Sequence, residues 1–284
     1  MRRTAIALVT GAVAALPAAC AGPPAGPSSE ASSSSAEPAA AVPGIEAEIV
    51  RLRTDEAVGG QVQVRLTDTG DTPFTVTAVV LRSPGFAPEP PKTVTAEYAP
   101  GRVIDLPVPF GDPVCDTAPV PAVAELTVVR PDGAVEQLHV PATADVLELI
   151  HAEECDVQAV TAVVDVAVTD LHDDGDDLTG SLTLTRRKGT EPVSARRLSR
   201  SVLIDATAEL PLELDGDEHS ASATVSFTPA TCDPHVLSET KKPYVFPLSV
   251  AVGKDDEVPV DLPLDQAARG LLAALVQRVC APPS

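Results

Sequence analysis

The chain carries two copies of one pattern about 120 residues apart, and this internal repeat limits the folds open to it. A Gly-x-x-Pro turn, a Cys-Asp pair and a closing apolar segment that ends in cysteine occur in the same order in both copies. The first copy has them at 70–73, 115–116 and 145–155, and the second has them at 189–192, 232–233 and 265–280. Each copy is as long as an ordinary domain, so the repeat predicts two tandem domains.

Short Val-rich runs lie between these landmarks, with alternating polarity and with Gly, Pro and Asp between them, as β strands do. In the first copy we expect strands at 46–53, 61–67, 74–81, 92–97, 102–108, 123–129 and 135–140. In the second we expect them at 161–169, 178–185, 199–204, 206–213, 219–227, 244–252 and 257–262. The closing segments have helical spacing, with Asp145 and Asp265 as N-caps. The chain is therefore predicted to be mainly β, with two tandem Ig-like antiparallel β-sandwiches that each end in a short helix.

The four cysteines of the two copies allow three disulfide connectivities. Because the copies repeat one unit, we expect each to carry its own bridge, Cys115 to Cys155 and Cys232 to Cys280. Each bridge would clamp the closing helix to the segment after the fifth strand. Aromatic residues make up only 2% of the chain, so the cores are built from Val, Leu and Ala and benefit from covalent support.

The N-terminus has the features of a signal peptide at 1–19, with Arg2 and Arg3 before an apolar run. The sequence 16–20, Leu-Pro-Ala-Ala-Cys, resembles a bacterial lipobox, in which the cysteine receives fatty acyl groups such as palmitate. Cys20 is therefore the predicted lipidation site, and cleavage by ordinary signal peptidase near Ala19 or Ala21 is the alternative. Residues 20–43 form an Ala-, Pro- and Ser-rich segment that we expect to be a disordered tether.

The sequence 66–73, Leu-Thr-Asp-Thr-Gly-Asp-Thr-Pro, looks like the strand-turn-strand of bacterial Ig-like modules. With the lipobox-like leader and the two copies, the chain resembles uncharacterised exported lipoproteins of actinobacteria with tandem Ig-like domains. The resemblance implies β-sandwich domains at 44–156 and 157–284 and a location on the extracellular face of the cell membrane. It implies no catalytic site and no cofactor, and the closing helices depart from a plain Ig module.

The formal net charge of −21 excludes nucleic acid as an expected partner, because the field of the whole protein repels a polyanion. Six of the twenty basic residues nevertheless gather on one predicted hairpin: Arg186, Arg187, Lys188, Arg196, Arg197 and Arg200. One hypothesis is an anion-binding face for an anionic wall polymer, a lipid headgroup or an acidic envelope protein. The alternative is an edge hairpin whose charges prevent strand-to-strand aggregation.

Three other segments carry candidate chemistry. The acidic run 170–177 partly fits a calcium loop but has Ser181 where the bidentate Glu belongs, and its alternative is a solvated hairpin turn. The Pro-rich loop 83–91 is a candidate binding loop that presents Phe86. Cys232 and His235 resemble a nucleophile and base, but the expected disulfide removes the thiol.

We find no metal-ligand spacing and no catalytic signature in the sequence. The sequence thus predicts a non-catalytic binding or structural module of the cell envelope, without metal or cofactor. The alternative is an envelope hydrolase whose paired carboxylates come together only in the fold.

Overall fold

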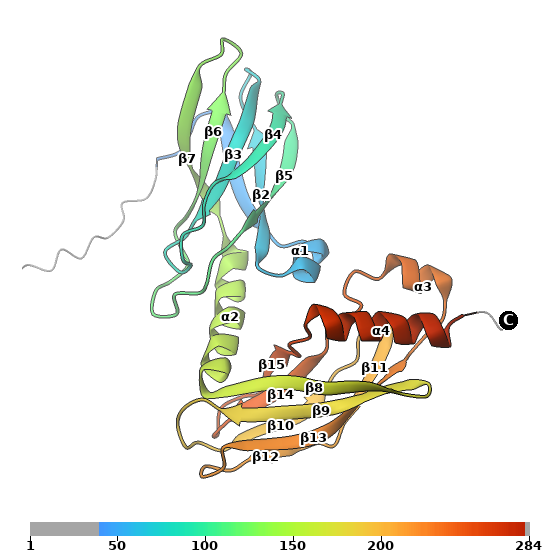
Figure 1. The fold of residues 1–284 in the computed structure, drawn as a ribbon. Coiled ribbons are helices and arrows are strands. Elements are labelled where there is room, and N and C mark those ends of the chain that lie inside the picture. The colour runs from blue at the N-terminus through green and yellow to red at the C-terminus, as the bar shows by residue number, and fades with distance from the viewer. Residues whose placement is uncertain (1–39, 282–284) are drawn as a thin grey trace, which may run out of the picture. The chain divides into compact units, whose positions relative to one another are not determined.

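The computed structural model describes residues 40–281 of this chain, and Figure 1 shows their fold. The predicted signal peptide, Cys20 and most of the predicted tether lie outside the described residues. The fold is mainly β, as predicted, and its strands form two groups with separate hydrophobic cores. We call them the N-terminal β unit (residues 45–143) and the C-terminal β unit (residues 164–261).

The N-terminal β unit is one seven-stranded sheet in the order β4-β3-β6-β7-β1-β2-β5. Its strands are β1 (Ile45–Val50), β2 (Gln61–Asp68), β3 (Phe74–Arg82), β4 (Lys92–Tyr98), β5 (Val103–Pro109), β6 (Ala122–Val129) and β7 (Val135–Thr143). The pairing of β1 with β7 is parallel and every other pairing is antiparallel. The edge strand β5 lies next to β3 and β4, so the sheet folds over its own core in a sandwich-like way. All seven strands predicted for the first copy are present, with ends within three residues of the expected ones.

The short helix α1 (Arg53–Val58) between β1 and β2 was not predicted. The strand expected at 46–53 ends at Val50, because the chain turns there into α1. Asp55 makes this turn possible, since its carboxylate accepts the free N–H group of Leu52 at the helix start.

The C-terminal β unit has two four-stranded sheets, β11-β13-β9-β8 and β12-β10-β14-β15. Their strands are β8 (Val164–Asp174), β9 (Asp177–Arg186), β10 (Val193–Leu198), β11 (Ile204–Ala208), β12 (Leu212–Leu214), β13 (Ser220–Pro229), β14 (Pro247–Val252) and β15 (Val258–Asp261). Six of the seven strands predicted for the second copy correspond to observed strands. The first of these, expected at 161–169, begins only at Val164. The fourth, expected at 206–213, is two strands, β11 and β12, separated by residues 209–211.

The strand predicted at 199–204 is wrong. The third strand, β10, lies earlier, and Ser201 occupies the turn that follows it. The Ser201 hydroxyl accepts the N–H groups of Leu203 and Ile204, which fixes a turn where a strand was expected.

Three more helices complete the fold: α2 (Asp145–Val163), α3 (Pro234–Glu239) and α4 (Gln266–Val279). Asp265 caps α4 as predicted, since its carboxylate accepts the Ala268 N–H at 2.7 Å. Asp145 does not cap α2, whose N-cap is Ala144 without a side-chain hydrogen bond. Helix α3 begins at Pro234, and the Asp233 carboxylate caps it by accepting the N–H groups of His235 and Val236.

Helix α2 is longer than predicted and contributes to both cores. It continues past Cys155 to Val163, because residues 156–163 contain neither Gly nor Pro to stop it. Leu147 and Ile150 are buried in the N-terminal core, whereas Val160 is buried in the C-terminal core.

Both predicted disulfides are confirmed. Cys115 is bonded to Cys155 and Cys232 to Cys280, with Cα–Cα separations of 5.6 and 5.2 Å. Each bridge ties a helix to the segment after the fifth strand of the corresponding predicted copy. Two such bonds indicate an oxidising, extracytoplasmic compartment. Within residues 40–281, no helix has the length and apolar character needed to cross a membrane.

Candidate functional site

The six basic residues of the predicted anion-binding face do not share a hairpin. Arg186 ends β9 and Arg196 and Arg197 lie on β10, and these two strands belong to different sheets. The connection from 187 to 192 carries the chain from one sheet to the other, with Gly189 at φ +75°. The hairpin part of the prediction is therefore wrong, because adjacent strands in the sequence need not pair in a sandwich.

Most of these basic side chains contact oxygen atoms of the protein itself. Arg186 donates to the carbonyl oxygens of Glu191, Leu214, Asp215 and Glu218, which makes it a structural clamp between loops. Arg187, Arg196 and Arg200 form ion pairs with Asp165, Glu257 and Asp205, respectively. Among the described residues, Arg197 has only the Ser249 hydroxyl as a side-chain partner, and no side-chain partner is found for Lys188. Anion binding stays a prediction. Four of the six basic side chains are already paired with oxygen atoms of the protein, which leaves mainly Lys188 and Arg197 to bind an anion.

The acidic run 170–177 forms the tip of the β8–β9 hairpin, with residues 170–174 in β8, Gly175 and Asp176 in the turn and Asp177 at the start of β9. Asp174 pairs with Asp177 across Gly175 and Asp176, which closes β8 onto β9. His172 contacts the carbonyl oxygen of Asp170 at 2.8 Å through Nδ1. The part of the chain that the structure describes contains no group of three or more His, Cys, Asp or Glu placed to hold a metal ion.

Phe86 is not presented to a partner. Its side chain is 6% exposed and packs against Phe110 and His151, with ring centroids at 5.1 and 5.4 Å. The Pro-rich loop therefore turns its aromatic residue inward, and the prediction of an exposed Phe86 is wrong. An apolar ring stabilises a loop more by burial than by exposure to water.

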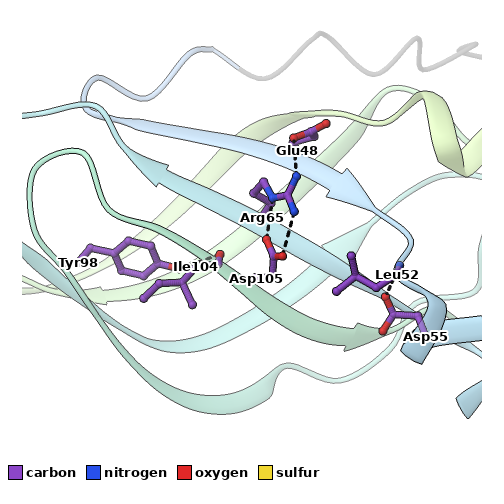
Figure 2. A network of polar contacts seen from close by, with 7 residues as sticks. All are labelled: Glu48, Leu52, Asp55, Arg65, Tyr98, Ile104 and Asp105. Atoms are coloured by element: carbon purple, nitrogen blue, oxygen red, sulfur yellow. Dashed lines mark hydrogen bonds and ion pairs between the residues drawn. The ribbon is translucent and has the colours of Figure 1, made fainter. Parts of the chain in front are cut away.

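The polar side chains of the N-terminal β unit form a structural network (Figure 2). The buried Asp55 carboxylate accepts a hydrogen bond from the Leu52 N–H, which Figure 2 shows. It also accepts hydrogen bonds from the side-chain amides of Gln61 and Gln63, which the figure does not draw. Arg65 donates two hydrogen bonds to the Asp105 carboxylate, from Nε at 2.7 Å and from Nη2 at 3.0 Å.

Two pKa values in this network are raised. The pKa of Arg65 lies above its ordinary value because Asp105 stabilises the cation. The Tyr98 hydroxyl donates to the Ile104 carbonyl, and burial raises the pKa of Tyr98. These groups join neighbouring strands of the sheet, and none of them lines the groove described next.

A groove of about 1590 Å³ lies at the junction of α2 with the C-terminal β unit. The second half of α2, the start of β8, the connection 187–191, β14 and β15 all contribute to its walls. Figure 1 shows β14 and β15 beside the end of α2, where β8 begins. The valines of the lining are Val157, Val160, Val163, Val166, Val252, Val258 and Val260, so much of the surface is apolar.

The charged lining of this groove is mainly acidic. Nine carboxylates line it: Glu153, Glu154, Asp156, Asp165, Glu191, Asp255, Asp256, Glu257 and Asp261. Three basic residues also line it: Arg187, Lys188 and Lys254. The run 255–257 is visible in the sequence as a charged loop, but nothing in the sequence places it beside α2.

Two groove carboxylates have raised pKa values. Burial raises the pKa of Glu154, and the neighbouring charge of Glu153 raises it further, against the opposing effect of Arg51. Asp261 is exposed at the surface, yet desolvation by the residues packed around its carboxylate raises its pKa more than Lys242 lowers it. Each carboxylate is therefore short of cationic partners in the protein alone.

Comparison with known proteins adds no function. No family model and no curated protein matches the chain. Three solved structures resemble it weakly. The YadV chaperone is 13% identical over 78% of this chain and 98% of its own, with a TM-score of 0.21. A protein of unknown function from Porphyromonas gingivalis W83 is 14% identical over 76% and 94%, with a TM-score of 0.20. A transglutaminase from red sea bream is 12% identical over 79% and 32%, with a TM-score of 0.25. Likenesses at these TM-scores support no statement about fold family or function.

Proposed function

We propose that this chain is an exported, lipid-anchored protein of the cell envelope that acts as a non-catalytic binding or structural module. In this proposal it comprises a signal peptide at 1–19, a tether at 20–43 and two tandem Ig-like domains at 44–156 and 157–284. Helix α2 crosses the boundary between the two domains. Membrane attachment is through acyl groups on Cys20.

The repeated strand order supports the Ig-like assignment. In both units the first, second and fifth strands of the predicted copy are neighbours, and so are the third, sixth and seventh. In the C-terminal unit, β8-β9-β13 and β10-β14-β15 are ordered like strands A-B-E and C-F-G of an Ig domain. The short strands β11 and β12 depart from that pattern, because β11 extends the first sheet and β12 the second, the reverse of the chain order of C′ and D. In the N-terminal unit β1-β2-β5 and β4-β3-β6-β7 follow the same order, joined through β1 and β7.

The observation that carries the proposal is the disulfide clamp on each unit. Each clamp ties a helix covalently to the β unit beside it, which limits how far the helix can move from the strands. Rigid scaffolds that display loops and edges suit binding better than they suit a moving active site. The favoured binding surface is the acidic groove.

The proposal is tested by measuring retention of envelope components on the oxidised full chain. We expect a binding module to retain at least one component saturably and reversibly. We also expect no reaction product from the envelope material, either with the wild type or with the double variant Glu154→Gln with Asp261→Asn. Mass analysis of the mature N-terminus tests the anchor, since an unmodified Cys20 thiol is incompatible with lipidation.

The second candidate is the envelope hydrolase, favoured by Glu154 and Asp261. Both carboxylates line one groove and both have raised pKa values, as general acids in hydrolases do. However, neither carboxylate shifts the pKa of the other, and Asp261 is exposed, unlike the coupled pair of a recessed site. Release of new low-mass products from envelope material by the wild type, but not by the double variant, would establish the enzyme and overturn the binding proposal.

A further inference from the structure

The acidic groove lies along two sheet edges that have no strand partner on their outer sides. Strand β8 pairs only with β9, and β15 pairs only with β14, in the strand pairings found for residues 40–281. Residues of both edges, among them Asp165, Val166 and Val260, line the groove. A free edge presents a row of N–H and C=O groups that can pair with another chain.

In the N-terminal unit, the edge that corresponds to the outer edge of β15 is paired with another strand. The strands that correspond to β8 and β15 are β1 and β7, the first and last of their unit. These two pair in parallel, Ala47 with Ala142 and Glu48 with Thr143, which leaves β7 with partners on both sides. In the C-terminal unit the corresponding pairing is missing, and the groove is found there instead. The outer edge of β7 is thus paired with β1, whereas no strand partner is found for the corresponding outer edge of β15 among residues 40–281.

The size of the groove favours a polypeptide over a small molecule. Pockets for small molecules enclose roughly 300–1,000 Å³. The groove measures about 1590 Å³ and is open. The four residues of β15 offer an edge roughly 13 Å long, enough for a short strand. Pro259 has no N–H group, so at that position an added strand can donate to the Pro259 carbonyl but receives no hydrogen bond in return.

The charge of the groove selects the kind of polypeptide. Three of its nine carboxylates, Glu153, Asp165 and Glu257, have an arginine partner within 4 Å. For the other six, Glu154, Asp156, Glu191, Asp255, Asp256 and Asp261, no ion pair is found in the described part of the chain. Unpaired carboxylates beside an apolar surface are complementary to Lys and Arg side chains interleaved with apolar ones.

We propose that the groove binds an extended, basic segment of a partner protein, which adds as a strand to the outer edge of β15. Side chains of a strand point alternately to opposite faces, so apolar residues face the valines of the groove and Lys or Arg residues face its carboxylates. This assignment names the partner class for the binding module proposed above and rests on that proposal. The raised pKa values of Glu154 and Asp261 agree with it, because a bound cation would relieve their desolvation.

The test uses a fluorescently labelled, acetylated and amidated peptide, Lys-Val-Arg-Val-Lys-Val, with the oxidised full chain. We expect saturable binding that weakens as salt is raised. Two control peptides separate the contributions. One has Glu in place of every Lys and Arg, and the other is methylated on alternate backbone nitrogens, which removes the N–H donors of one strand edge. We expect at least tenfold weaker binding for both.

Matched charge variants locate the site on the protein. Asp255→Asn with Asp256→Asn removes two groove carboxylates, and we expect it to weaken peptide binding about three- to tenfold. Asp176→Asn with Asp217→Asn makes the same change in net charge at exposed positions outside the groove, and we expect less than a twofold effect. Amide hydrogen exchange at Val258, Val260 and Asp261 should slow when the peptide is bound, whereas Pro259 has no amide hydrogen.

Three results would overturn the inference. These are equal binding of the acidic peptide, equal binding of the backbone-methylated peptide, or equal effects of the two double variants. Self-association of the chain through β15, seen by sedimentation and abolished by the groove variant, would also overturn it, because a second copy would then be the occupant. If the peptide fails to bind while an envelope component is still retained saturably, this inference falls and the proposed function stands. If neither binds, both fall.

Discussion

The disulfide between Cys115 and Cys155 offers a clean test of what stabilises the N-terminal unit. Cys115 is exposed and Cys155 is half-buried, and neither belongs to the hydrophobic cores. Replacing both by Ser therefore removes the crosslink and little packing. The expected effect acts mainly through the unfolded chain, which regains the freedom that the crosslink had removed.

The magnitude follows from the length of the closed loop. The two cysteines are 40 residues apart in the sequence. In the chain-entropy model, a loop of this length corresponds to about 4 kcal/mol at 25 °C. A domain is stable by about 5–15 kcal/mol, so the loss is a large fraction of the total. With a urea m-value of about 1–3 kcal/mol per M, the unfolding midpoint should fall by roughly 1.3–4 M.

The chain provides its own reporter for this measurement, since it contains two tyrosines and no tryptophan. Tyr98 is 2% exposed and stacks on Phe74 in the N-terminal core, with ring centroids 4.8 Å apart. Tyr244 packs against the C-terminal core. In a Tyr244→Phe background, tyrosine emission during urea unfolding reports the N-terminal unit alone.

Cys232→Ser with Cys280→Ser is the matched control, because it opens a loop of 48 residues in the other unit. We expect it to leave the Tyr98 transition within about 1 kcal/mol of the parent. A loss below about 1 kcal/mol for the Cys115 and Cys155 variant would refute the chain-entropy reasoning. Equal losses for the two variants would show that the units unfold as one cooperative body.

Three further predictions concern single carboxylates. Asp55→Ala leaves the Leu52 N–H and two glutamine amides without their acceptor, and should lower the stability of the N-terminal unit by about 2–4 kcal/mol in the same urea assay. Asp265→Ala removes the cap of α4 and should cost the C-terminal unit about 1 kcal/mol, read from Tyr244 in a Tyr98→Phe background. Asp261→Asn should stabilise the protein at pH 7 and not at pH 3. The raised pKa of Asp261 means that its contribution to stability is present below the ordinary value of 3.8 and is lost as the pH rises through the folded value. A constant difference between variant and wild type from pH 3 to pH 7 would contradict this reasoning.

The sequence was sufficient to locate the strands of the first copy, because most of the runs alternate in polarity and each is followed within three residues by Pro or Asp. The third strand of the second copy failed for a physical reason. A bulge between Ala195 and Arg197 breaks the two-residue period of β10, so its polar end does not alternate as a strand should. The disulfides were predictable because duplication restricts their pairing.

The candidate site was not predictable from the sequence. The basic residues from Arg186 to Arg200 are close in sequence, but β9 and β10 belong to different sheets. A cluster of charges in the sequence does not indicate whether two consecutive strands pair or lie in different sheets. The groove depends on the continuation of α2 to Val163 and on the missing pairing between β8 and β15. Both are results of tertiary packing, which hydrophobic periodicity does not encode.

The position of the two disulfides also decides how the chain responds to a mechanical pull on its ends. A force applied to the chain ends passes through each disulfide and not through the residues that the disulfide encloses. The enclosed residues, 116–154 and 233–279, therefore cannot be extended even after their secondary structure has unfolded. For separations of 40 and 48 residues, roughly 140 and 165 Å of contour length are withheld from extension. A reductant would release both reserves, so single-molecule stretching should record a longer chain after reduction.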